Sequence, residues 1–130
     1  MKENKLSKLK VLIADDSTMI RFELTTMLED MGLEIAGEAE NGVQAVELYQ
    51  QLKPDLVTLD IIMPEKDGIT ALKEILALDP SAKIVMVSAM GDKKSLLTCL
   101  SAGAFDFVEK PFVAEKVKHT INNLIKTLNR

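Results

Sequence analysis

Cysteine is nearly absent from this sequence, in which Cys99 is the single example. One cysteine excludes an intramolecular disulfide and a zinc site built from cysteine ligands. The lack of a disulfide framework fits a reducing compartment. Cys99 lies among apolar residues at helical spacing in LLTCLSAG, which predicts a small, buried or half-buried side chain.

Long hydrophobic runs and an excess of basic charge are also missing. No apolar stretch approaches the ~20 residues that span a bilayer, and the first ten residues lack the apolar core of a secretory signal. We therefore expect a cytoplasmic protein with no membrane insertion. The net charge of −4 argues against nucleic acid as a partner, because phosphate backbones bind clustered basic surfaces.

The N-terminal lysines do not form such a basic surface. They are spread along a polar stretch, at positions 2, 5, 8 and 10. We interpret residues 1–8 as a polar, solvated extension and residues 9–130 as one domain, which is the number that a chain of this length predicts.

The remaining sequence alternates short apolar runs with longer amphipathic ones. The apolar runs predict strands at residues 10–14, 33–40, 55–60, 83–88 and 104–109. The amphipathic runs predict helices at residues 17–32, 43–52, 69–79, 92–103 and 113–128. Five strand–helix units in succession predict an α/β fold, a doubly wound five-stranded parallel sheet with helices on both faces.

Capping residues support several of these helix boundaries. Ser17 is a candidate N-cap, and Asp92 (or Gly91) is another. Gly32 and Gly103 are candidate helix ends. The pair Asn41-Gly42 is compatible with a hairpin, but the helical period of VQAVELYQQL after it favours a strand-to-helix loop.

Polar side chains follow four of the five predicted strands. The first strand ends in Asp15-Asp16 and the third in Asp60, whereas the fourth ends in Ser88 and the fifth in Lys110. In an open parallel sheet, ligands bind at the carboxyl ends of the strands. Three carboxylates, a hydroxyl and a lysine at one rim therefore indicate a binding site.

The charges at this rim indicate the chemistry. Close carboxylates repel by about 1 to 4 kcal/mol per pair, and one lysine offsets only one charge. Mg²⁺ binds one or two carboxylates together with waters and phosphate oxygens, so the rim suits a magnesium site that receives a phosphoryl group. Asp60, alone at the end of the central strand, is the best nucleophile. The adjacent Asp15 and Asp16 suit metal binding, and Ser88 could donate a hydrogen bond to a phosphoryl oxygen.

Each of these residues also has an ordinary structural role when it is taken alone. The acidic pair before Ser17 could cap a helix, Asp60 could end a strand in a turn, and Lys110 could be a solvated charge. The single His119 lies between lysines in a predicted helix and is expected to be exposed. The prediction of a site depends on the joint placement.

Four segments resemble the receiver domains of bacterial two-component response regulators. They are ADDS, TLDIIMPEKDG, VSAM and AGAFDFVEKPF, and the resemblance covers residues 9–128. Within that family, the sequence is most similar to the single-domain, CheY-like chemotaxis regulators. The resemblance implies a flavodoxin-like sheet with strand order 2-1-3-4-5.

The resemblance also implies roles for the rim. It makes Asp60 the phosphoacceptor for a phosphohistidine of a sensor kinase. Asp16, Asp60 and the backbone carbonyl of Ile62 would bind Mg²⁺ directly, Asp15 would act through a bound water, and Mn²⁺ could substitute. Lys110 would contact the phosphoryl group and precede a cis proline peptide.

The expected output of such a protein is a conformational switch. Ser88 would move toward the phosphoryl group and let Phe107 turn inward, which would change the surface of the fourth helix, fifth strand and fifth helix. The implied partners are a CheA-like histidine kinase and a downstream protein, for which a flagellar motor switch is one candidate; a phosphatase is another candidate partner. A monomer is expected, with no activity beyond its own phosphorylation and dephosphorylation. The sequence leaves no segment for a DNA-binding output domain.

Two features depart from the best-known chemotaxis regulators. Phe107 stands where those proteins carry tyrosine, so a partner contact through that hydroxyl is not expected. Ile62 and Met90 occupy positions that gate the attacking water in the family. Because both are apolar here, we expect slow autodephosphorylation.

Other functions fit the sequence less well. A Mg²⁺-dependent phosphohydrolase with an aspartyl nucleophile generally needs a second Asp two residues later, where this sequence has Ile62. A flavin-binding module would need a phosphate-cradling Ser/Thr/Gly run. A phosphorelay intermediate or phosphate sink within the receiver family remains open.

Overall fold

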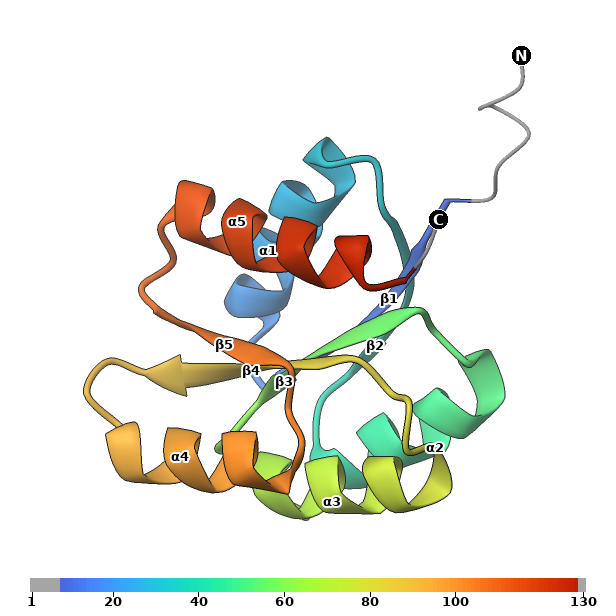
Figure 1. The fold of residues 1–130 in the computed structure, drawn as a ribbon, viewed down its shortest axis with the longest axis vertical. Coiled ribbons are helices and arrows are strands. Elements are labelled where there is room, and N and C mark those ends of the chain that lie inside the picture. Colours follow the sequence, from blue (N-terminus) through green and yellow to red (C-terminus); the bar gives the residue numbers. More distant parts are fainter. Residues whose placement is uncertain (1–7, 129–130) are drawn as a thin grey trace.

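The fold is a single parallel sheet between two layers of helices (Figure 1). The structure is a computed structural model that describes residues 8–128, so nearly all of the predicted extension at residues 1–8 lies outside the described residues. The strand order is β2-β1-β3-β4-β5, which confirms the predicted topology. The strands are β1 (Lys10–Ala14), β2 (Glu34–Ala39), β3 (Leu56–Asp60), β4 (Ile84–Ala89) and β5 (Asp106–Lys110).

Helices cover both faces of this sheet. They are α1 (Thr18–Asp30), α2 (Gly42–Leu52), α3 (Gly68–Leu78), α4 (Lys93–Ala102) and α5 (Ala114–Lys126). Figure 1 shows α1 and α5 on one face and α2, α3 and α4 on the other. Among residues 8–128, no helix has the length and apolar character needed to cross a membrane.

Side-chain caps explain where four of the helices begin. The side chains of Ser17, Asn41, Asp67 and Asp92 each accept a hydrogen bond from a backbone N–H three residues later. Such a bond satisfies one of the free N–H groups at a helix start. The predicted caps Ser17 and Asp92 are therefore confirmed, and Asn41 begins α2 instead of forming a hairpin. Gly103 ends α4 in the left-handed conformation, as predicted.

The ends of the last two strands differ from the prediction. β5 begins at Asp106, not at Ala104, because the Ala104 N–H still bonds to the Cys99 carbonyl of α4. β4 extends one residue beyond Ser88, since Ala89 pairs with Lys110. Ser88 is thus the penultimate residue of its strand.

Each face of the sheet has its own hydrophobic core. One cluster includes Leu59, Ile75 and Cys99 and lies under α2, α3 and α4, while the other lies under α1 and α5. The buried position of Cys99 confirms its prediction, and His119 is exposed as expected. All five residues of β3 are buried, so this central strand carries Asp60 into an apolar environment.

Candidate functional site

The carboxyl ends of the central strands bring three predicted site residues into contact. Asp15 directly follows β1, Asp60 ends β3 and Lys110 ends β5. Lys110 Nζ lies 3.1 Å from Asp15 Oδ2 and 3.3 Å from Asp60 Oδ2. The lysine thus bridges two carboxylates that are separated by 45 positions in the sequence. The peptide bond between Lys110 and Pro111 is cis, as the resemblance implies.

A third carboxylate joins this pair. Asp15, Asp16 and Asp60 each offer an oxygen, and the three oxygens lie within 4.8 Å of one another. Asp15 and Asp60 are buried, whereas Asp16 is exposed. Hard divalent cations take such oxygen ligands and keep several waters. The donor set therefore fits Mg²⁺, with Asp16 on the solvent side.

Burial makes Asp60 hard to ionise. Loss of water around the side chain, followed by the negative charge of Asp15, raises the pKa of Asp60 from 3.8 to about 6. The charge of Lys110 and its hydrogen bond lower the pKa, but they offset only part of this effect. Asp60 is still mostly ionised at neutral pH and can act as a nucleophile.

The two carboxylates keep Lys110 charged. Burial alone lowers the pKa of Lys110, but the charges of Asp60 and Asp15, together with their hydrogen bonds, outweigh burial and raise it above 10.5. Lys110 therefore presents a fixed positive charge next to Asp60 at neutral pH.

Ser88 provides a buried hydroxyl near the same edge. The residue is 1% exposed, and its Oγ has no hydrogen-bond partner within residues 8–128. A buried polar atom without a partner is unfavourable, and such atoms are frequent at sites that receive a ligand. The hydroxyl is available to a group that enters the site.

The remaining predicted residues lie outside the carboxylate–lysine contacts. The side chain of Ile62 is 70% exposed and that of Met90 is 71% exposed. Phe107 is half-buried and packs against the core cluster under α2, α3 and α4.

The prediction that the acidic pair could cap a helix is only partly correct. The N-cap of α1 is Ser17, and Asp15 instead accepts a hydrogen bond of 2.8 Å from the Ser17 N–H through Oδ1. Asp15 therefore has two contacts, because its other oxygen faces Lys110. Sequence reasoning missed Arg21, whose guanidinium donates to the Asp15 carbonyl oxygen; an arginine in an amphipathic helix gives no sign of burial.

The fold and this site agree with comparisons to known proteins. The model of the response regulator receiver domain matches residues 11–122, and the chain belongs to this family. It is similar to single-domain members along most of its length. It is 51% identical to the chemotaxis protein CheY of Bacillus subtilis over 120 residues, which are 92% of this chain and 98% of that protein.

Two further relatives support the same relationship. The chemotaxis protein CheY of Thermotoga maritima is 48% identical over 117 residues, covering 90% of this chain and 98% of that protein. The crystal structure of the CheX-CheY-BeF₃-Mg²⁺ complex of Borrelia burgdorferi matches with a TM-score of 0.90 and 35% identity, covering 96% of this chain and 95% of that one.

Proposed function

We propose that this protein is a phosphorylation-activated response regulator of a chemotaxis pathway and that Asp60 is its phosphoacceptor. The observation that carries the proposal is the Asp60 carboxylate, buried at the end of the central strand with Lys110 Nζ at 3.3 Å and two more carboxylates beside it. The CheY relatives support the chemotaxis assignment.

The chain's own groups have distinct roles in this reaction. An Asp60 carboxylate oxygen attacks phosphorus as the bond from phosphorus to the donor's histidine nitrogen breaks, and the electron pair of that bond stays on the nitrogen. Lys110 stabilises charge on the phosphoryl oxygens, and the free hydroxyl of Ser88 donates to one of them. Asp15, Asp16 and Asp60, with the Ile62 carbonyl, would hold Mg²⁺ or Mn²⁺. The bound ion supplies positive charge for the phosphoryl oxygens.

Phosphorylation of Asp60 by acetyl phosphate tests the proposal. With Mg²⁺ present, intact mass is expected to rise by ~80 Da. Asp60→Asn removes the nucleophile and is expected to abolish the gain. The protein without Mg²⁺ is expected to show little gain, because three close carboxylates repel the incoming phosphoryl group.

A receiver domain known to accept phosphate from acetyl phosphate serves as the positive control. If that control gains mass and this protein does not, the rim is a metal-binding or degenerate site and the proposed function is wrong. An equal gain in Asp60→Asn would place the phosphoacceptor elsewhere.

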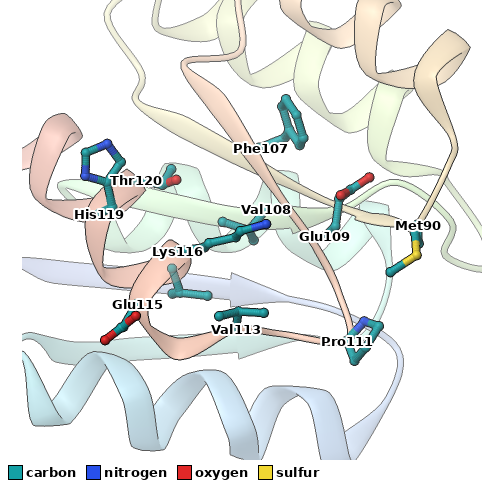
Figure 2. A pocket seen from close by; sticks show the side chains of 11 residues that line it. Met90, Phe107, Val108, Glu109, Pro111, Val113, Glu115, Lys116, His119 and Thr120 are labelled. Atoms are coloured by element: carbon teal, nitrogen blue, oxygen red, sulfur yellow. The ribbon is translucent and has the colours of Figure 1, made fainter.

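We further propose that the output is a docking event on the face formed by α4, β5 and α5. A pocket of about 530 Å³ lies on this face, and Figure 2 shows Phe107 and Glu109 of β5 and Lys116 and His119 of α5 around it. Movement of Ser88 toward the phosphoryl group would shift the populations of two Phe107 positions and reshape this surface.

The proposed partners follow from this mechanism. A CheA-like histidine kinase would supply the phosphoryl group, and the target would be a protein such as the flagellar motor switch. A phosphatase is a third proposed partner; the Borrelia relative was crystallised with a second protein, CheX. We propose a cytoplasmic monomer whose chemistry is limited to its own phosphorylation and dephosphorylation. A phosphorelay intermediate or phosphate sink would share the site and differ only in its output.

The lifetime of the phosphorylated state is expected to depend on Ile62. This apolar side chain is 70% exposed and lies two residues after Asp60, so it offers no hydrogen bond to an attacking water. Ile62→Asn supplies an amide there and is expected to speed loss of phosphate severalfold. Intact mass followed over time after removal of acetyl phosphate measures this rate. Loss no faster than in the parent would contradict the prediction, and Leu97→Asn on exposed α4 is a matched control.

A further inference from the structure

A buried arginine holds the backbone between the two adjacent acidic residues. Arg21 lies in α1 and is 8% exposed. Its Nη1 donates to the Asp15 carbonyl oxygen at 2.7 Å, and its Nε donates to Glu38 Oε1 at 2.8 Å. A longer contact of 3.3 Å joins Nη2 to Thr18 Oγ1. The guanidinium thus connects α1, the end of β1 and β2.

The carbonyl that Arg21 contacts belongs to the peptide unit between Asp15 and Asp16. A peptide unit is planar, so the direction of its carbonyl sets the direction of the Asp16 N–H and the position of the Asp16 Cα. Asp16 is exposed, and its backbone therefore largely determines where its carboxylate points. Arg21 acts on the acidic pair through this plane.

The contacts around Asp15 show how completely this unit is restrained. The Asp15 N–H donates to the Ala39 carbonyl at 3.0 Å, and its side chain is held by the Ser17 N–H and by Lys110. The carbonyl is the remaining polar group of the residue, and Arg21 binds it. Glu38 precedes Ala39 in β2, so Arg21 and the Ala39 bond tie the ends of β1 and β2 together.

The charge of Arg21 is balanced separately from this carbonyl contact. Glu38 is the ion-pair partner, and its side chain is 47% exposed, so water can solvate a change at Glu38. The two functions of the guanidinium, charge pairing and backbone positioning, therefore go to different acceptors and can be separated by substitution.

We propose that Arg21 is a positioning residue for divalent-cation binding and acts by fixing the peptide plane between Asp15 and Asp16. The inference rests on the proposed function, because it concerns the same acidic site. Groups that orient metal ligands without touching the metal typically change metal affinity 10–100-fold when they are removed. Arg21 touches neither the proposed ion nor the phosphoryl group.

The test is titration of the unphosphorylated protein with Mg²⁺ by isothermal calorimetry. Arg21→Lys keeps a positive charge, but its ammonium has one compact head and pairs with the charged Glu38 in preference to a neutral carbonyl. We expect its Kd for Mg²⁺ to rise roughly tenfold. Glu38→Gln keeps an acceptor for Arg21 and leaves the Asp15 carbonyl contact in place, so its Kd is expected to match the parent.

A stability control separates positioning from general loosening of the fold. Ile121→Val removes one methyl from the core under α5, where Ile121 is 1% exposed, and is expected to lower stability without changing the Kd for Mg²⁺. Urea unfolding of all four proteins, followed by circular dichroism, establishes that each is folded.

The outcomes are distinct. A Kd in Arg21→Lys equal to that of the parent overturns the positioning role, as does an equally weakened Kd in Glu38→Gln or Ile121→Val. A parent that binds no Mg²⁺ at millimolar concentration overturns the proposed function itself, whereas a parent that binds while Arg21→Lys binds equally well overturns only the present inference.

Discussion

Gly68→Ala is expected to lower the free energy of unfolding by about 3 kcal/mol, a large effect for the addition of one methyl group. A Cβ at Gly68 would lie 1.9 Å from the Asp60 carbonyl oxygen and 2.8 Å from the Ile61 Cα. Both are backbone atoms, so no side chain can rotate away. The Gly68 N–H also donates to the Ile61 carbonyl at 2.7 Å, and separation of the two segments would break this bond.

Urea unfolding followed by circular dichroism measures this effect, and Gly32→Ala is the control. Gly32 has φ +89° but no atom within 4 Å of its Cβ position, so alanine there meets only backbone strain, which costs about 1 kcal/mol. Gly68 adds steric overlap beside the phosphoacceptor, so we also expect slower phosphorylation of Asp60 in Gly68→Ala. Equal destabilisation by the two substitutions would show that the loop after β3 can move aside.

The contact at Gly68 illustrates what sequence patterns cannot predict. Strand positions follow from local apolar runs, and the parallel-sheet rule then places Asp15, Asp60 and Lys110 at one edge. The close approach of Gly68 to Asp60 depends on how α3 packs after the loop, and glycine also occurs near helix starts where no such contact exists. Contacts of this kind are set by tertiary structure, which leaves no periodic signal in the chain.

The helix boundaries show the same division. The caps Ser17 and Asp92 were predictable because a side chain bonds to a backbone group three residues away. The start of β5 was not predictable, because the apolar run from Ala104 has the pattern of a strand while its N–H still belongs to the turn that ends α4. Arg21 was missed for a related reason, since only the fold brings Glu38 and the Asp15 carbonyl to its guanidinium.

Asp60→Asn is expected to make the protein more stable at pH 8 without Mg²⁺, by about 3 kcal/mol. The folded-state pKa of Asp60 is raised from 3.8 to about 6, so the folded protein binds this proton more tightly than the unfolded chain does. Stability of the parent therefore falls as pH rises from about 4 to 6 and stays reduced at higher pH. The variant lacks this titration. Lys110 keeps a partner in the variant, because Asp15 Oδ2 is 3.1 Å from its Nζ.

Urea unfolding of parent and Asp60→Asn at pH 4 and pH 8 measures the difference, with Glu47→Gln on the exposed face of α2 as a neutral control. Equal stabilities of parent and variant at pH 8 would contradict a raised pKa for Asp60. Added Mg²⁺ should then stabilise the parent more than the variant, since a ligand that binds only the folded state adds to its stability. The unfavourable buried charge of Asp60 would thus be relieved by the same ion that its phosphorylation requires, which couples the ionised nucleophile to occupation of the metal site.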